Sequence, residues 1–373
     1  MGIYLVLLTI VAIISVIILL INIKQGIKFT LTVYIVLLFL FSGLRYHTGW
    51  DWEAYDYFFD ELAKANIITL FHYNIFGYEP GFVFFTYISS VLNIPPFLFF
   101  SIITVSLIIS SAHRYLGKYV FIFCLLYLYY GYFHNFSIVR QGVAAALFAY
   151  SIRFLILNNN KFYVVIMIGA LFHISAIMLF AIPLLCRWSK KIPFTPIVLL
   201  SLITVLFPIS EMIGLKTILS TVPALKNYLN NDTLSYKVGF SLKYVELLLI
   251  FYCFYDGRFV ELMKKNFSEQ NFYIFRSLIL VELLIYSIFN DFSIFYERLS
   301  VYFEFSHAIA IAMIISAFKY RRVQFLLLMI LLLIVFFRYY QLVNSPVRVQ
   351  GEMSHLERFE NYCSIFTKEA CQR

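Results

Sequence analysis

The chain has 373 residues, of which 62% are hydrophobic, 20% aromatic and only 13% charged, and its formal net charge is +9. Soluble globular chains contain about 45–50% apolar and about 25% charged residues, so this composition excludes a soluble enzyme, a disordered chain and a disulfide-rich secreted module. It predicts an integral membrane protein. Basic residues of membrane proteins gather in cytoplasmic loops, so the positive charge does not indicate a nucleic-acid partner.

A helix that crosses a bilayer needs ~20 apolar residues. Two apolar segments, 80–93 and 162–186, are too short or too broken for a regular span. The first apolar run is no cleavable signal peptide, because no basic residues precede it and no A-x-A site follows it. We predict an all-α, polytopic helix bundle. The strong candidates for full spans are 3–21, 29–44, 97–112, 119–133, 139–157, 194–213, 238–255, 272–290, 299–317 and 323–340.

The orientation of the spans is predicted from short basic clusters, which the positive-inside rule assigns to the cytoplasm. With all six clusters inside, 80–93 and 162–186 each begin and end on one side, as re-entrant or broken segments. This topology has about ten full spans and both termini in the periplasm. The alternative is twelve spans with some clusters outside. The clusters are Lys24/Lys28, Arg114/Lys118, Arg153/Lys161, Arg187/Lys190/Lys191, Arg258/Lys264/Lys265 and Lys319/Arg321/Arg322.

The chain shows no internal repeat and no soluble segment, so we expect one integral membrane domain over 1–373. Its longest polar parts are a periplasmic loop at 45–79 and a C-terminal tail at 341–373. Cys363 and Cys371 share this tail, and we expect them to pair if the tail faces an oxidising compartment. The five cysteines form no CxxC or Cys/His cluster, so no metal site is expected.

Polar side chains gather at helix ends on the predicted periplasmic side. Ionisable groups near the apolar slab usually face a cavity, and the Arg guanidinium suits phosphate oxygens. Arg140 and Arg298 each begin a predicted helix, whose N-terminus also favours anions. The combination predicts a site for a lipid diphosphate, although interface anchoring also explains single Arg and aromatic side chains. The polar set is Arg45, Asp51, Glu79, His134, Arg140, Gln141, His173, Glu297 and Arg298.

A second polar set lies deeper in the predicted spans. Glu246 and Glu282 are near mid-span, and Lys243 and Arg276 are candidate partners. Such groups form either a structural bridge between helices or an ion path, and an ion path would favour a transporter. Glu297, Glu304 and His307 also share one helical stripe.

Five segments in chain order resemble the EpsG family of bacterial exopolysaccharide and O-antigen polymerases, a Wzy-like group. Arg45, Gly49, Asp51 and Tyr55 match the family's R-x-x-x-G-x-D-x-x-x-Y signature. The C-terminal NYCSIF lacks the Pro of the family's N-P-Y ending, so no role is carried over there. The five segments are LRYHTGWDWEAY at 44–55, YEPGF at 78–82, SIVRQGVAAALF at 137–148, LFHISA at 171–176 and YERLSVYF at 296–303.

The resemblance implies a polysaccharide (O-antigen) polymerase of the bacterial inner membrane. A glycan on undecaprenyl diphosphate would be transferred to the non-reducing end of another lipid-linked repeat unit at the periplasmic face. No cofactor, metal or nucleotide sugar is expected, because Arg donors can stabilise the departing diphosphate. The expected partners are the undecaprenyl-diphosphate-linked oligosaccharide and membrane lipid, with a chain-length regulator as a candidate protein partner and no nucleic acid.

The resemblance and the chemistry together assign candidate roles. A carboxylate or His can take the proton from the attacking hydroxyl. The alternatives to the polymerase are a lipid-linked glycan flippase or other transporter, an O-antigen ligase and a membrane acyltransferase. The candidate residues are Asp51, His173 and Glu297 for catalysis, Arg140, Arg298 and Arg45 for diphosphate, and Glu79, Gln141, Tyr55 and His134 for sugar binding or orientation.

Overall fold

The computed structural model describes residues 2–21, 26–49, 51–64, 77–189, 192–221, 237–344 and 362–367. The chain forms two compact units. The first comprises Met1–Phe180 and Arg322–Arg373, and the second comprises Ala181–Arg321. In the described ranges nearly every element is a helix, and the single sheet has two strands of two residues each. The structure confirms the predicted all-α character.

The first unit contains most of the elements that carry the signature segments. It also contains the C-terminal helix, α21. Its elements are α1 (Gly2–Ile21), α2 (Ile27–Gly43), β1 (Arg45–Tyr46), α3 (Trp52–Ala63), α5 (Pro80–Val91), α6 (Pro96–Leu116), η2 (Gly117–Tyr119), α7 (Val120–Tyr130), α8 (His134–Ser137), α9 (Val139–Ile156), α10 (Lys161–Ala170), η3 (Ile174–Ala181, which ends at the unit boundary), α21 (Arg321–Asn344) and β2 (Cys363–Ser364).

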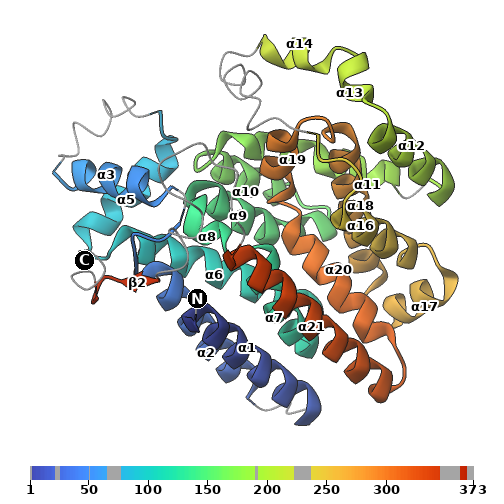
Figure 1. Cartoon of the computed structure of the whole chain (residues 1–373), viewed down its shortest axis with the longest axis horizontal. Coiled ribbons are helices and arrows are strands. Elements are labelled where there is room, and N and C mark those ends of the chain that lie inside the picture. Colours follow the sequence, from blue (N-terminus) through green and yellow to red (C-terminus); the bar gives the residue numbers. More distant parts are fainter. Residues whose placement is uncertain are drawn as a thin grey trace. The chain divides into compact units, whose positions relative to one another are not determined.

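Helix packing in the first unit forms a continuous series. α2 packs on α6, α6 on α9, and α9 on α10. α1 and α2 run side by side (Figure 1), joined by a 2.7 Å hydrogen bond between the Ser15 and Tyr34 hydroxyls. Small residues at 144–146 on α9 are buried, and small side chains allow this kind of close approach between helices.

The segment Pro96–Tyr130 turns back on itself. As one straight helix its 35 residues would span about 52 Å. Yet both ends of the segment lie close to Arg45. Its guanidinium carbon is 4.2 Å from the ring centre of Phe97, at the start of α6, and 5.1 Å from the ring centre of Phe136, beyond the end of α7. Gly117, with φ of +54°, ends α6 at the turn. Two separate passes, as predicted for 97–112 and 119–133, fit this geometry.

The C-terminal tail packs against the start of the loop predicted at 45–79. β2 pairs with β1 in antiparallel register, with Arg45 opposite Ser364. Tyr362 stacks on Phe41 with ring centres 4.3 Å apart. Cys363 is disulfide-bonded, and Cys371, its predicted partner, lies outside the described residues. Residues 362–367 and the start of this loop therefore lie at the same end of the first unit.

The second unit is built around α18, which contacts α11, α12, α16 and α20. Most of the α18 side chains are buried. The elements of this unit are α11 (Ile182–Ser189), α12 (Phe194–Leu206), α13 (Ile209–Met212), α14 (Leu215–Ser220), α16 (Leu242–Cys253), α17 (Gly257–Asn266), α18 (Glu269–Ile288), α19 (Ser293–Ser300) and α20 (Glu304–Ala317).

Among the described residues, five helical stretches are long and apolar enough to cross a membrane, and a bent pair, α19 with α20, raises this to six. The chain is thus a multi-pass membrane protein by length and composition, while the ten-span count and the periplasmic termini stay predictions. Two of the predicted spans are interrupted: 194–213 breaks at Phe207–Pro208, and 299–317 begins within the bend at 301–303. Segment 162–186 is broken, as expected, into α10, η3 and α11.

Candidate functional site

Arg45 is buried and organises the backbone around it. Its side chain is 1% exposed. The guanidinium donates to the carbonyl oxygens of Ser42, Thr48 (3.1 Å) and Phe136 (3.2 Å), and it lies over the rings of Phe97 and Phe136. Three of its five N–H donors are therefore taken by the chain itself. These contacts indicate that Arg45 positions the surrounding backbone, and its role in diphosphate binding stays a prediction.

Two glycines of the signature segments allow loops to approach closely. Gly49 has φ of +106°, and a Cβ there would overlap the carbonyl of Phe136. Gly81 donates its N–H to the Leu171 carbonyl oxygen at 2.8 Å, and a Cβ there would lie 2.7 Å from that oxygen. The loop at 45–49 thus packs directly against the backbone of Phe136, and the start of α5 packs against the backbone of Leu171. These contacts bring four signature segments to one end of the first unit.

Arg140 is the centre of a group of four side chains, which we call the Arg140 cluster: Tyr55, Tyr78, Glu79 and Arg140. Arg140 Nη1 donates to Glu79 Oε2 at 2.5 Å. Glu79 Oε1 accepts from the Ile174 backbone N–H at 3.2 Å. The guanidinium carbon of Arg140 lies 4.6 Å from the Tyr78 ring centre. The Arg140 side chain is also hydrogen-bonded to the Tyr55 side chain. Sequence reasoning missed Tyr78, although its position next to Glu79 in YEPGF was available as a signal.

The Arg140 cluster is suited to hold an anion. The Arg140 side chain is 24% exposed, and its buried Nε has no hydrogen-bond partner in the described part of the chain. Arg140 lies in the first turn of α9, whose N-cap, Ile138, has no side-chain oxygen to satisfy the terminal N–H groups. Helix N-termini carry partial positive charge. Burial raises the pKa of Tyr55 to about 12, so its hydroxyl stays protonated and can donate.

The other predicted residues of the first unit lie around this cluster. Asp51 occupies the N-cap position of α3, and its charge helps to raise the pKa of Tyr78, after the larger effect of burial. His173 Nδ1 lies 2.7 Å from Ser175 Oγ. His173 directly precedes Ile174, whose N–H donates to Glu79. Gln141 is buried next to Arg140. The side chain of His134 lies outside the described residues.

The structure corrects the expected position of Arg298. Arg298 lies in the last turn of α19, and α20 begins only at Glu304, after a 64° bend. A helix C-terminus favours cations and gives no additional field for an anion, so the predicted helix N-terminus at Arg298 is absent. Glu297 is exposed on the same short helix. Both residues belong to the second unit, and their membership in one pocket with Arg140 stays a prediction.

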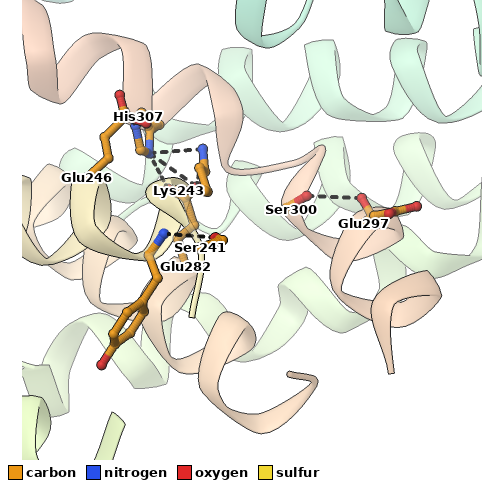
Figure 2. A network of polar contacts seen from close by, with 8 residues as sticks. Ser241, Lys243, Glu246, Glu282, Glu297, Ser300 and His307 are labelled. Atoms are coloured by element: carbon orange, nitrogen blue, oxygen red, sulfur yellow. Dashed lines mark hydrogen bonds and ion pairs between the residues drawn. The ribbon is translucent and has the colours of Figure 1, made fainter. Parts of the chain in front are cut away.

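A buried charged group lies in the second unit, on α16, α18 and α20. Lys243 Nζ lies 3.2 Å from Glu282 Oε1, and His307 Nδ1 lies 3.1 Å from Glu282 Oε2. His307 Nε2 lies 3.7 Å from Glu246 Oε1. Figure 2 shows Lys243 and Glu246 near the His307 ring. Glu282 and His307 are fully buried. We call Lys243, Glu246, Glu282 and His307 the His307 cluster; its side chains contact one another between α16, α18 and α20.

Arg276, a predicted partner of these carboxylates, makes other contacts. It donates to the Ser189 carbonyl oxygen at 3.3 Å and lies over the Tyr255 and Tyr273 rings. The described residues contain no group of three or more His, Cys, Asp or Glu side chains arranged to hold a metal ion. The metal independence expected from the sequence stays a prediction.

The chain matches a known protein family. The model of the EpsG family matches residues 28–354, which include all five signature segments and the elements that carry both clusters. No curated protein and no solved structure matches the chain significantly. Because the family model covers most of the sequence, the chain belongs to the EpsG family.

Proposed function

We propose that the chain is a Wzy-like polysaccharide polymerase. It transfers a glycan from undecaprenyl diphosphate to the non-reducing end of another lipid-linked repeat unit, at the periplasmic face of the inner membrane. The acceptor hydroxyl oxygen attacks the anomeric carbon, the bond from that carbon to the diphosphate oxygen breaks, and the hydroxyl proton passes to a base. The released product is the lipid diphosphate.

The Arg140 cluster is the observation that carries this proposal. The largest barrier to the reaction is the negative charge that develops on the leaving diphosphate, and preorganised donors reduce it most. Arg140 is held by Glu79 at 2.5 Å and by Tyr55 at the start of α9, so its guanidinium is oriented before substrate arrives. The exposed part of this guanidinium and the first N–H groups of α9 supply donors for the diphosphate oxygens.

Glu79 orients Arg140, and Asp51 or His173 serves as the base. Glu79 has both carboxylate oxygens in use, one with Arg140 and one with the Ile174 N–H, so it is a poor proton acceptor. Asp51 is half-buried near Tyr55 and Tyr78, and His173 lies one residue from Ile174. Arg45 is reassigned from diphosphate binding to positioning of the 45–49 loop.

The test is incubation of the purified chain with a lipid-diphosphate-linked repeat unit, followed by separation of the products by chain length. We expect a ladder of oligomers without added nucleotide sugar. Arg140→Ala should remove the ladder, whereas Arg153→Ala should retain it. Arg153 is the matched control because it lies on the same helix, 13 residues from Arg140 in the sequence, about 20 Å along the axis. An unchanged ladder from Arg140→Ala would refute the proposed site.

The His307 cluster favours a second candidate function, a lipid-linked glycan transporter. Ionisable groups inside membrane helices commonly mark ion paths, and Glu282 and His307 are both fully buried. Loss of transport would leave the single lipid-linked unit on the cytoplasmic leaflet. Accumulation there in cells carrying Glu282→Gln, with the in vitro ladder absent from the wild-type protein, would favour the transporter over the polymerase.

A further inference from the structure

A cavity of about 210 Å³ lies in the first unit, and none of the side chains of the Arg140 cluster lines it. It is bounded by α3, by the end of α5, by the start of α6 and by the C-terminal tail. Its volume is below the ~300–1,000 Å³ of pockets for drug-sized ligands, so it suits one ring rather than a chain of rings. The side chains that line it include Trp52, Asp56, Asp60, Ser90, Phe97 and Ile365.

The α3 side of this cavity combines an aromatic ring with two carboxylates. Trp52, Asp56 and Asp60 are spaced i, i+4 and i+8, which places them on one face of the helix. Trp52 stacks on Phe97 with ring centres 6.1 Å apart and planes 15° from parallel. Trp52 is 6% exposed, and its buried Nε1 has no hydrogen-bond partner in the described ranges. An unsatisfied buried donor is unfavourable unless a ligand pairs with it.

We propose that this cavity binds the sugar at the non-reducing end of the acceptor glycan, an inference that rests on the proposed polymerase function. A sugar ring has apolar C–H faces that pack on indole and phenyl rings, and hydroxyl groups that donate to carboxylates. The Trp52 N–H would donate to a ring or hydroxyl oxygen. The carboxylates of Asp56 and Asp60 repel a phosphate, and three of the N–H groups of Arg45 in the cavity wall are occupied by carbonyl oxygens. The lining therefore disfavours an anionic ligand and suits a hydroxyl-rich one.

The C-terminal tail completes this site. Ile365 lines the cavity, and its N–H donates to the Leu44 carbonyl oxygen at 2.9 Å. The pairing of β2 with β1 and the stacking of Tyr362 on Phe41 hold this residue in place. The tail thus has a binding role in addition to a structural one.

The test uses the full chain in detergent and two measurements. Isothermal titration with the free repeat-unit oligosaccharide, which carries no lipid diphosphate, reports sugar binding without any contribution from the diphosphate. The polymerisation assay reports KM for the lipid-linked acceptor and kcat. Asp56→Asn and Asp60→Asn keep the side-chain volume and remove a charged acceptor. Glu61→Gln is the matched control, because Glu61 is next to Asp60, pairs with Lys64 at 3.1 Å and does not line the cavity.

We expect Asp56→Asn and Asp60→Asn each to weaken oligosaccharide binding and to raise the acceptor KM by about tenfold or more, since hydrogen bonds to charged groups are worth more than a factor of ten. kcat and the Glu61→Gln variant should change little. Wild-type binding and KM in both Asn variants, with melting temperatures unchanged, would overturn the cavity assignment and leave the polymerase intact. Aspartate-dependent binding without any polymer from the wild type would overturn the polymerase and would leave the cavity as a sugar-binding site without an acceptor role.

Discussion

Replacing Arg140 with Ala tests both the stability and the chemistry of the proposed site. The change leaves the Glu79 carboxylate, which is 14% exposed, without its guanidinium partner. Breaking a fully buried pair is destabilising by about 3–5 kcal/mol. Because Arg140 is 24% exposed and Glu79 keeps the Ile174 N–H, we expect a smaller loss, about 1–2 kcal/mol after solvent screening. The melting temperature should fall by only a few degrees.

The effect on turnover should be much larger than the effect on folding. Removing one preorganised donor from a developing negative charge reduces kcat by about 10²–10³-fold. Arg140→Lys keeps the charge but loses the planar fork, so it should recover only part of the rate. The assay is single-turnover release of lipid diphosphate by folded protein, with Arg153→Ala as control. A rate within threefold of wild type for Arg140→Ala would refute the reasoning.

Three further experiments test the backbone contact at Gly49, the Lys243–Glu282 ion pair and the orientation of the C-terminal tail in the membrane. Gly49→Ala should destabilise the protein by about 2 kcal/mol or more, because φ of +106° is strained for Ala and a Cβ overlaps the Phe136 carbonyl; thermal unfolding measures this, and an unchanged melting temperature would contradict the described loop. Lys243→Met should destabilise the protein by less than the ~3–5 kcal/mol of a fully buried broken pair, because Lys243 is 22% exposed and Glu282 keeps His307 as a partner. A second change, Glu282→Gln, should restore much of the lost stability; additive losses in the two single variants and the double variant would argue against the pair. A membrane-impermeant maleimide should label Cys363 from outside intact spheroplasts only after reduction, since this cysteine is disulfide-bonded; labelling only from the cytoplasmic side would reverse the predicted orientation.

Local pattern and composition were sufficient for the helical class and for much of the grouping at one end of the first unit. The signature spacing placed Tyr55, Glu79 and Arg140 among the candidates, and the structure joins them directly. The Lys243–Glu282 pair was also anticipated. Such pairs can be predicted because an unpaired charge in apolar surroundings is energetically costly, so opposite charges there usually form ion pairs.

What the sequence could not show depends on contacts between distant segments and on breaks inside apolar runs. The burial of Arg45 requires rings from Phe97 and Phe136, which are 52 and 91 residues away in the chain. The bend at 301–303 lies in an apolar run, so hydropathy alone joins α19 to α20 and puts Arg298 at the wrong end of a helix. The contacts of Arg276 with an aromatic ring and a backbone carbonyl oxygen join residues far apart in the chain, which no local pattern indicates.

The family signature thus combines two kinds of residue that a sequence pattern treats alike. Arg45 and Gly49 fix how the backbone segments meet, while Glu79 and Arg140 form the polar site. We therefore expect Arg45→Lys to lower the yield of folded protein, because an ammonium cannot donate to three carbonyls in the plane of the guanidinium, yet to leave the turnover of the folded fraction within a few-fold of wild type. Arg140→Lys should show the reverse: a normal folded yield and a large loss of turnover. Measuring lipid-diphosphate release per mole of monodisperse protein after gel filtration distinguishes the two. If Arg45→Lys folded normally and lost turnover, Arg45 would act on substrate, and its assignment as a scaffold residue would be wrong.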